Sequence, residues 1–572
     1  MNSIGLKKFR RFANFPSIDL GDVTILVGGN NSGKSTIVKA LLLCMYNLRN
    51  MRINDRRRED GENLFSSGMS SPIFRFNPLE FYDVKIKTFA RAIHNRPVAE
   101  EVLTSDGDYR TIVGLPTTMT FSFSVGGFAF EIEVAGNKDE QLTYGDVVSI
   151  TIEDKANAVR YGANYINHRM SFEVLNAQSA EDFDLLRSLF KEFKKVKAQA
   201  DAAEQSGNLE QIADLTSRLE KITSQINSMC DRDEEGEELT EDELKQLIKT
   251  QYRKNNPVAA SYYMPLGVNM EVPKEPTVLN VINNIGNYAN TKAIPPKEGA
   301  DYDSFTDYAM AMEAYEHDDE QREAIKLEID KIRKSYNALS DVLANAGIEY
   351  ISAHAANQNT LYNTADRNDY IAQTVHDFYN EKIAKGSKYD RFVREWMSQF
   401  EIGSDYKIDT IGGEAYTVDI VNEDGSVVPL ADKGMGSIQM MILILRLATI
   451  QHQNRRSFWP TSIIIEEPEQ NLHPRLQSRL ATLFSTIAGP GKFRFVIETH
   501  SEYLIRKAQV LVAEANFIDE EDLREHNPFK IYYLPQDDSE RYEMKFRTDG
   551  SFENDFKEGF FDEAENLAFK IL

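Results

Sequence analysis

The sequence predicts an α/β fold in which one sheet, built from both ends of the chain, is interrupted by a helical insertion. Three observations lead to this prediction. Residues 23–43 have the pattern of a buried strand, a glycine-rich loop and a helix. Charged segments with heptad spacing begin near residue 180. Apolar strands and helices alternate again from residue 347.

These changes of pattern suggest the division of the chain. Its 572 residues are more than one hydrophobic core usually holds. We expect an N-terminal lobe over residues 1–178, an inserted helical or coiled-coil arm over 179–346 and a C-terminal lobe over 347–572. The two lobes together would form one α/β unit.

Composition narrows the class of protein. The chain is 41% hydrophobic and 27% charged, which is typical of a folded globular protein. The formal net charge of −25 argues against a broad basic surface for nucleic acid. Local basic clusters at residues 7–11 and 56–58 are either small anion-binding patches or solvated faces.

Cysteine content and hydropathy point to the compartment. The two cysteines, Cys44 and Cys230, provide neither a disulfide framework nor a zinc site. The chain starts without the apolar core of a signal peptide, and the longest apolar runs, 40–46 and 440–445, are too short to span a bilayer. We therefore expect a cytoplasmic protein with no membrane partner.

The most specific motif is the run Gly28-Gly29-Asn30-Asn31-Ser32-Gly33-Lys34-Ser35, which lies between a strand and a helix as a phosphate-binding loop requires. Its glycines let successive backbone N–H groups point at one anion, and the next helix adds its positive end. Lys34 would reach the terminal phosphates of a nucleoside triphosphate, and the Ser35 hydroxyl would bind Mg²⁺. The alternative is a glycine-rich turn that only caps a helix. The predicted nucleotide-binding residues here are Gly28, Asn30, Asn31, Ser32, Gly33, Lys34, Ser35 and Thr36.

The rest of the N-terminal lobe has a β pattern. Residues 118–125 alternate polar and apolar side chains, as does the run 128–134 from Phe130 onward, and Gly126-Gly127 joins the two runs. This arrangement predicts a β-hairpin. A further strand is expected over 147–152.

Two heptad seams lie in the insertion. The first consists of Ile212, Leu215, Leu219, Ile222, Ile226 and Met229, and the second of Ile325, Ile329, Ile332, Tyr336, Leu339 and Leu343. Two seams of this kind suggest a paired antiparallel arm, with the Pro-, Gly- and Asn-rich segment 256–299 as its tip. The alternative is that both are ordinary amphipathic helices on the globular core.

Acidic and imidazole side chains follow two apolar strands of the C-terminal lobe. The strand 463–465 is followed by Glu466, which would hold Mg²⁺, and by Glu467, which would accept a proton from the attacking water. The strand 493–497 is followed by Glu498, Thr499 and His500, and His500 would contact the γ-phosphate. Without the phosphate-binding loop these residues would be unremarkable surface acids and a structural histidine.

A second glycine-rich segment precedes a long helix. Lys433, Gly434, Gly436 and Ser437 lie where backbone N–H groups meet the positive end of that helix. One phosphate-binding loop wraps only one side of a triphosphate, so this segment from another copy of the chain would close the other side. The alternative is a simple glycine-rich helix start.

These four elements, in this order and split by a helical insertion, resemble the SMC-like branch of the ABC ATPases. The resemblance is closest to the stand-alone bacterial ATPases of the OLD-related AAA family. Segment 432–439 is similar to their signature motif, 466–474 to their Walker B motif and D-loop, 499–502 to their switch-histidine segment, and 559–563 to the closing motif of one subgroup. The resemblance is good over residues 1–50 and 347–572 and only architectural over 180–345.

The resemblance implies an ATPase with ATP and Mg²⁺ as cofactors, and a head-to-head dimer that holds two ATP molecules at its interface. Opening and closing of this dimer would be transmitted to the arm. Phe12 falls where relatives carry an aromatic near the base, and Gln358 is a candidate for the Q-loop residue. Segment 352–355 lacks the arginine that relatives often carry there.

The resemblance also leads to an expectation about partners. Full-length OLD nucleases carry a Toprim domain after the ATPase, whereas about 70 residues follow His500 here. We expect an ATPase that controls a separately encoded effector nuclease, as in the Septu, PARIS and retron-associated antiphage systems. DNA or a phage protein is the candidate trigger.

Two other functions are open at this point. One is an SMC-like ATPase for DNA repair or DNA tethering, which the basic clusters favour and the net charge disfavours. The other is a nuclease in one chain, with its metal site within residues 50–175 or 530–572, where the sequence has no convincing metal-binding cluster.

Overall fold

The structure of the chain is a computed structural model. It describes residues 1–52, 62–63, 73–77, 86–94, 100–103, 109–112, 118–136, 143–164, 169–174, 177–206, 209–229, 244, 264–265, 326–327, 329–352, 361–363, 369–457, 459–489, 492–535, 542–556 and 570. Several expectations fall outside the described residues: the basic cluster 56–58, Gln358, the segment 559–563 and, apart from Met264–Pro265, the segment 256–299.

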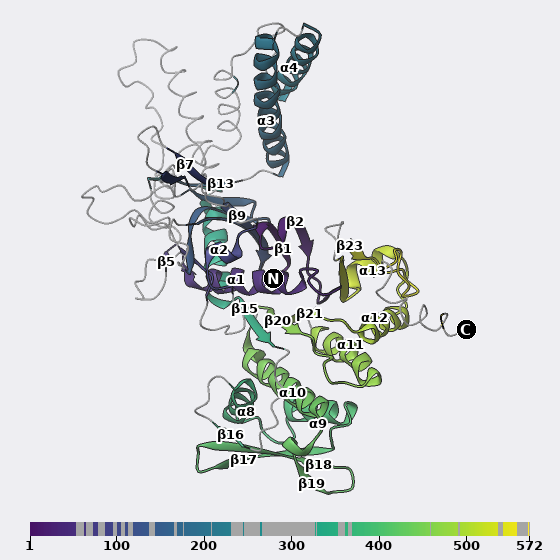
Figure 1. Cartoon of the computed structure of the whole chain (residues 1–572). Helices are drawn as coiled ribbons and strands as arrows, with labels where there is room; N and C mark the ends of the chain where they lie inside the picture. Colours follow the sequence, from purple (N-terminus) through teal and green to yellow (C-terminus); the bar gives the residue numbers. More distant parts are fainter. Residues whose placement is uncertain are drawn as a thin grey trace, which may run out of the picture.

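A six-stranded sheet joins the two ends of the chain (Figure 1). Its order is β15 (Gly347–Ile351), β20 (Thr461–Glu466), β21 (Phe493–Glu498), β3 (Val23–Gly28), β22 (Phe529–Leu534) and β23 (Tyr542–Met544). All neighbours are parallel except β22 and β23. Every residue of β3 is buried, so this strand needs a partner on both edges. The prediction of one α/β sheet built from both ends of the chain is confirmed.

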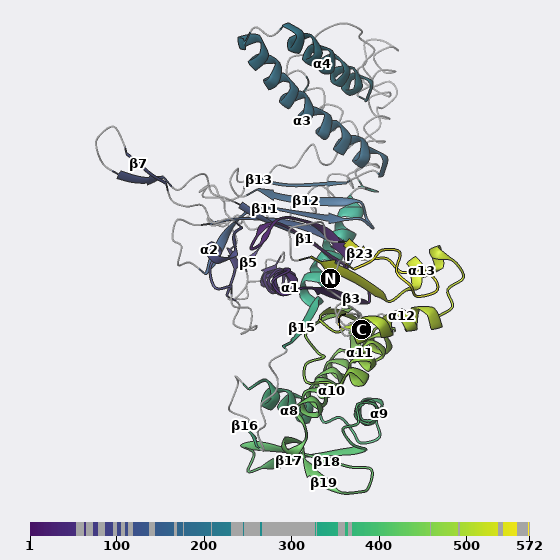
Figure 2. The ribbon, with the colours of Figure 1, turned by 45° about the vertical axis from the view of Figure 1, so that its right-hand side comes forward.

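The two faces of this sheet are covered by different layers. Side chains alternate along each strand, so Leu26, Ile464 and Val496 face α1 (Lys34–Asn50). Their neighbours Ile463 and Ile465 face the C-terminal helices. Helix α1 therefore lies between the six-stranded sheet and a larger antiparallel sheet (Figure 2).

The antiparallel sheet forms most of the N-terminal lobe. Its order is β14 (Met264–Pro265), β13 (Arg169–Val174), β12 (Val159–Asn164), β11 (Tyr144–Asp154), β10 (Phe128–Ala135), β9 (Thr118–Val125), β1 (Ser3–Phe9) and β2 (Phe12–Asp19), and β6 (Ile73–Arg75) also pairs with β11. The predicted hairpin is confirmed as β9–β10. Its turn needs glycine, because Gly126 and Gly127 have φ of 58° and 88°. Shorter elements of this lobe are β4 (Met51–Arg52), β5 (Glu62–Asn63), α2 (Phe89–Ala92), β7 (Glu100–Leu103) and β8 (Tyr109–Ile112).

The C-terminal lobe adds helices and a small sheet. Its helices are α8 (Tyr370–Asn380), α9 (Lys388–Gln399), α10 (Met435–Gln453), α11 (Pro474–Ala488), α12 (Glu502–Glu514) and α13 (Glu520–His526), with short 3₁₀ turns at Leu430–Asp432 and Asn454–Arg456. The four-stranded sheet has the order β16 (Tyr362–Asn363), β18 (Ala415–Val421) and β17 (Asp405–Ile411), and β19 (Val427–Pro429) pairs with β18. Of these elements, α8, α9, α10 and the small sheet lie below the six-stranded sheet in Figure 1. Helix α10 is buried over most of its length, which explains its apolar sequence.

Two helices of the insertion project from the rest of the molecule. Helices α3 (Ala177–Ser206) and α4 (Leu209–Met229) lie side by side, away from the six-stranded sheet, in both views (Figures 1 and 2). Leu215, Ile222 and Ile226 of the first heptad seam pack with Leu189 and Phe193 of α3. The first seam is therefore covered by the helix that precedes it in the chain.

The second seam packs elsewhere, so its predicted pairing with the first seam is wrong for the described residues. Ile329, Ile332 and Leu339 belong to the hydrophobic cluster of the N-terminal lobe. The hydroxyl of Tyr161 on β12 donates to the Ile332 carbonyl at 3.3 Å. An apolar seam specifies that one face is covered and not which surface covers it, and here the antiparallel sheet does so.

The helix that carries the second seam leads directly into the six-stranded sheet. Residues 329–345 are helical, and β15 follows from Gly347. Arg49, near the end of α1, binds this junction. Its guanidinium donates to the carbonyls of Ala346 at 3.3 Å and Ile348 at 3.2 Å. Helix α1 thus connects the phosphate-binding loop at its start with the base of the insertion at its end.

None of the described helices is long and apolar enough to cross a membrane.

Arg446 of α10 offers a test of the contact between α10 and the sheet. Its guanidinium donates to Asp377 of α8 and to Glu349 of β15, both at 2.7 Å. The variant Arg446→Ala leaves two part-buried carboxylates without their cation, and we expect it to lower the free energy of unfolding by about 2 kcal/mol. Thermal melting of the purified chain measures this. The control Arg524→Ala removes only an exposed helical pair with Glu520 and should melt like the wild type. Equal melting temperatures of both variants would contradict the stabilising role of Arg446.

Candidate functional site

The phosphate-binding loop is built around the Lys34 side chain. Its ammonium donates to the carbonyls of Gly28 at 2.9 Å and Gly29 at 3.0 Å. Gly28 and Gly33 have φ of 149° and 105°, which favour glycine. A Cβ atom on Gly28 would lie 2.1 Å from the Leu534 carbonyl oxygen. The loop therefore keeps a tight ring of backbone around one buried cation, as a phosphate cradle requires.

The turn between β1 and β2 covers this loop from outside. A Cβ atom on Gly33 would lie 2.4 Å from the Phe12 ring and 2.8 Å from the Arg11 side chain. The Arg11 guanidinium carbon lies 6.0 Å from the centroid of the Phe12 ring. Phe12 is only 6% exposed, so its ring packs on the loop instead of offering a free face. The expected contact of Phe12 with a base stays a prediction.

Two carboxylates from neighbouring strands lie beside the start of α1. Glu466 and Glu498 are paired residues of β20 and β21, so both point to the α1 face of the sheet. The Ser35 hydroxyl donates to Glu498 Oε1 at 2.9 Å. The Tyr350 hydroxyl donates to Glu466 Oε2 at 2.8 Å. The predicted residues Ser35 and Glu466 thus belong to one site.

The backbone turns sharply after Glu466. Glu467 has φ of 43°, a left-handed conformation that is uncommon for this residue type, and its N–H donates to the Glu498 carbonyl at 2.7 Å. Its carboxylate accepts a hydrogen bond from the Gln470 amide and lies 3.8 Å from Nε2 of His500. The buried Glu469 carboxylate accepts the His500 backbone N–H at 2.6 Å. The two predicted catalytic residues, Glu467 and His500, are therefore brought together.

Burial and neighbouring charges shift the pKa values of the ionisable side chains at this edge of the sheet. Burial and, after it, the Glu466 carboxylate raise the pKa of Glu498 to about 7. Burial lowers the pKa of Lys34, although Glu498, Glu467 and Glu469 oppose this effect. Burial and the Lys34 charge lower the pKa of His500, against the opposing charge of Glu467. His500 is therefore neutral near pH 7 and able to donate a hydrogen bond without adding charge.

The donors present fit a magnesium ion. Mg²⁺ prefers oxygen ligands from carboxylates, hydroxyls, phosphates and water, and Ser35 and Glu466 present such oxygens, with the Glu498 carboxylate beside them. Glu498 Oε2 is buried and has no hydrogen-bond partner among the described residues. No group of three or more His, Cys, Asp or Glu side chains in the described part of the chain is arranged to hold a metal by itself. Nucleotide phosphates and water would therefore complete the coordination shell.

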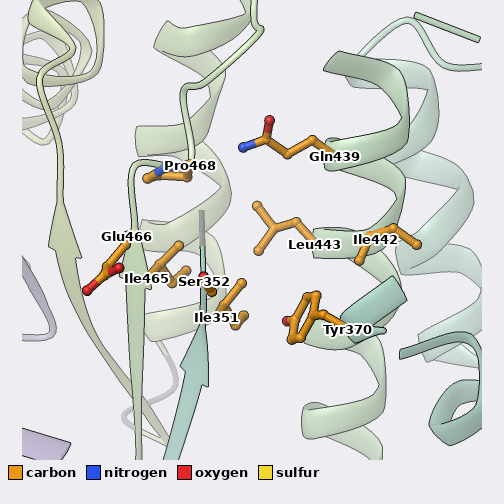
Figure 3. A pocket seen from close by; sticks show the side chains of 9 residues that line it. All are labelled: Ile351, Ser352, Tyr370, Gln439, Ile442, Leu443, Ile465, Glu466 and Pro468. Carbon is orange, nitrogen blue, oxygen red and sulfur yellow. The ribbon is translucent and has the colours of Figure 1, made fainter. Parts of the chain in front are cut away.

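A small cavity lies on the other side of Glu466 (Figure 3). Its volume of about 20 Å³ has room for one water molecule. Tyr370 of α8, Gln439 of α10 and Ser352 after β15 line it together with Glu466. The cavity marks where α10 meets the strand that carries the acids.

The glycine segment before α10 lies on the opposite face of the sheet from α1. Gly434 is the N-cap of α10, and its neighbour Ile438 packs with the C-terminal cluster. The predicted ligand Lys433 uses its ammonium within the same lobe, where it donates to the Ile402 carbonyl at 2.9 Å and to Asn422 Oδ1 at 2.6 Å. Residues 433–437 and the α1 helix that follows the phosphate-binding loop therefore lie on opposite faces of the sheet within one chain.

The two glycines of this segment have different surroundings. A Cβ atom on Gly436 would lie 2.5 Å from the Asn471 carbonyl oxygen, in the loop that follows the acids. Gly434 has no atom within 4 Å of the same position. Gly436 is thus required for packing within the chain, and Gly434 is free to face another molecule.

Sequence reasoning did not assign a role to three residues of the site. For Glu498 the sequence does contain a usable pattern. Two apolar strands each end in a glutamate, Glu466 and Glu498, and these two residues are paired in the sheet. Tyr350 and Glu469 gave no comparable signal, because their partners lie far away in the sequence or on the backbone.

The fold and the site together define a P-loop nucleotide-binding domain of α/β class. Residues 1–505 match the family described as AAA ATPase domain. This match covers most of the 572 residues, so the chain belongs to that family of ATPases. No curated protein matches the chain.

The solved structures that match the chain include heads of Smc proteins. The Smc head with an extended coiled coil bound to the C-terminal domain of ScpA, from Pyrococcus furiosus, is 11% identical, with a TM-score of 0.31, over 100% of this chain and 98% of that chain. The Smc head with a coiled coil and joint from Pyrococcus yayanosii is 12% identical, with a TM-score of 0.30, over 96% and 97%. The SMC head from Thermotoga maritima is 9% identical, with a TM-score of 0.26, over 88% and 91%.

Lys34 provides the direct test of the nucleotide site. The variant Lys34→Ala removes the cation at the centre of the loop, and we expect nucleotide affinity to fall by at least about tenfold, or about 1.4 kcal/mol. Titration calorimetry with a non-hydrolysable ATP analogue measures this. The control is Lys492→Ala. Lys492 directly precedes the first residue of β21, at the end of the strand far from the site, so this variant should bind the analogue like the wild type. Unchanged affinity in Lys34→Ala would contradict the loop assignment.

Proposed function

We propose that the chain is an ATP-hydrolysing switch of SMC-like type that works as a dimer and controls a separate effector nuclease in bacterial antiphage defence. The observation that carries the ATPase part is the convergence of Lys34, Ser35, Glu466, Glu467 and His500 at one sheet edge. The defence role and the cytoplasmic location rest on the resemblance to OLD-related ATPases.

The residues of the site divide the chemistry between them. The Lys34 ammonium and the start of α1 would hold the phosphates, with Ser35 and Glu466 as oxygen ligands for Mg²⁺ and Glu498 as the acceptor for the Ser35 proton. A bound Mg²⁺ would neutralise charge that develops on the phosphates. Glu467 would accept a proton from water, and neutral His500 would donate to the γ-phosphate.

The shared site follows from the two faces of the sheet. Helix α1 lies on one face and α10 on the other, so a chain does not close its own site with residues 433–437. A second copy that presents Gly434 would supply the missing helix end. Self-association would then depend on bound ATP.

The insertion would carry the nucleotide state outward. Arg49 ties the end of α1 to Ala346 and Ile348, and the helix over 329–345 begins the path from there. Helices α3 and α4 project beyond the antiparallel sheet and are the proposed contact for effector or trigger (Figure 1).

Gly434 tests the shared site without disturbing the fold. The variant Gly434→Gln places a side chain where its own chain leaves open space, so folding and nucleotide binding should persist. We expect ATP-dependent dimerisation, measured by light scattering with the non-hydrolysable analogue, to be lost and turnover to fall at least about tenfold. The control Thr410→Gln changes an exposed position of β17 and should dimerise normally. A fully active Gly434→Gln chain would argue against sharing.

Glu467 tests the proposed role in the cell. The variant Glu467→Gln should bind ATP normally but hydrolyse it about 10²- to 10⁴-fold more slowly, because its amide cannot accept the proton. Bacteria that carry the chain with its neighbouring genes should lose protection against phage in this variant. Intact protection, or cleavage of DNA by the purified chain alone, would contradict the proposal. ATP turnover that is stimulated by DNA with steep salt dependence would instead favour the DNA-tethering function.

A further inference from the structure

The Ser35 hydroxyl has to be oriented before it can bind a cation. A hydroxyl has one proton and two lone pairs, so it ligates a metal through oxygen when its proton points away from the metal, and an acceptor on that side fixes this orientation. In this structure that acceptor is Glu498 Oε1, at 2.9 Å. Glu466, the carboxylate predicted for the metal, accepts instead from Tyr350.

Glu498 is suited to a fixed orienting role. Its side chain is only 5% exposed and lies at the end of β21, between β20 and β3. The N–H of Glu467 donates to the Glu498 carbonyl at 2.7 Å, which fixes the backbone of this residue. Its second oxygen, Oε2, is buried and has no hydrogen-bond partner in the described part of the chain. A buried carboxylate oxygen without a partner is costly unless a ligand or its water meets it.

We propose that Glu498 is a positioning residue of the cation site, which holds the Ser35 hydroxyl so that its oxygen faces the divalent ion bound with the nucleotide. Two neighbouring strands would then act on the same ion: β20 supplies Glu466 as a ligand, and β21 supplies the acceptor for the Ser35 proton. This inference rests on the ATPase part of the proposed function and not on the role in defence.

The test measures metal binding directly, with Mn²⁺ as the probe. Electron paramagnetic resonance of the full chain with a non-hydrolysable ATP analogue gives the Mn²⁺ affinity, and calorimetry without metal gives the affinity for the analogue alone. Glu498→Gln keeps an acceptor for Ser35 but loses the charge, whereas Glu498→Met loses both. We expect Mn²⁺ affinity to fall about tenfold in Glu498→Gln and further in Glu498→Met, since residues that orient metal ligands typically contribute that much.

Affinity for the analogue without metal separates this role from a general structural one. Removal of a negative charge near the phosphates should leave that affinity unchanged or raise it. If Glu498 only supports the fold, both affinities should fall together, and the proposal would be overturned. The matched control is Asp154→Asn, a buried carboxylate outside the site that accepts from the backbone N–H groups of Ala156 and Asn157. An equal loss of Mn²⁺ affinity in this control would also overturn it.

A double substitution decides whether Glu498 acts through Ser35. Ser35→Ala alone should weaken Mn²⁺ binding, and adding Glu498→Gln to it should cause little further loss, because the group to be oriented is gone. Fully additive losses would mean that Glu498 binds the ion independently and would refute the positioning role. If the wild-type chain binds neither the analogue nor Mn²⁺, the proposed ATPase function fails. If the wild type and the variants bind Mn²⁺ equally well, only the positioning role of Glu498 fails.

Discussion

The pairing of β3 between β21 and β22 is the constraint on which the rest of the structure depends. A strand from the first 30 residues completes a sheet that otherwise comes from the last 230. The phosphate-binding loop follows directly from β3, and the end of β21 carries Glu498 and leads to His500. The loop and the residues that act with it therefore have a common frame only when both ends of the chain have folded together. This explains how a long insertion is tolerated: it follows β13 of the antiparallel sheet, and the chain returns to the six-stranded sheet through its edge strand β15.

The electrostatic balance of the site follows from this frame. The sheet edge gathers four carboxylates, those of Glu466, Glu467, Glu469 and Glu498, around one buried lysine. Phosphates brought to such an edge add further negative charge, and Lys34 alone does not offset it. A divalent cation is the natural counter-charge. Burial and the Lys34 charge lower the pKa of His500 and outweigh the opposing charge of Glu467, so this imidazole stays neutral.

Much of the site was predictable from the sequence because its parts are local patterns at strand ends. The loop from Gly28 to Ser35 and the acids after β20 were identified by residue type and spacing alone. Partners that depend on distant packing were not. The first seam pairs with α3, and the second lies on the antiparallel sheet, because a seam specifies an apolar face and not the surface that covers it. Lys433 is expected at the nucleotide of another copy, which stays a prediction, and its contacts with Ile402 and Asn422 in its own chain follow only from the tertiary arrangement of that lobe.

The close approach of Gly436 to the Asn471 carbonyl has a consequence for two copies acting together. Asn471 belongs to the loop that begins with Glu467, the acid proposed to activate water, and Gly436 lies in the first turn of the helix that would touch the other pocket. When hydrolysis relaxes the loop in one half, the surface presented to the opposite nucleotide would shift with it. ATP turnover in such a dimer would be cooperative or alternating, because the site of each protomer would respond to whether the other protomer still has ATP bound.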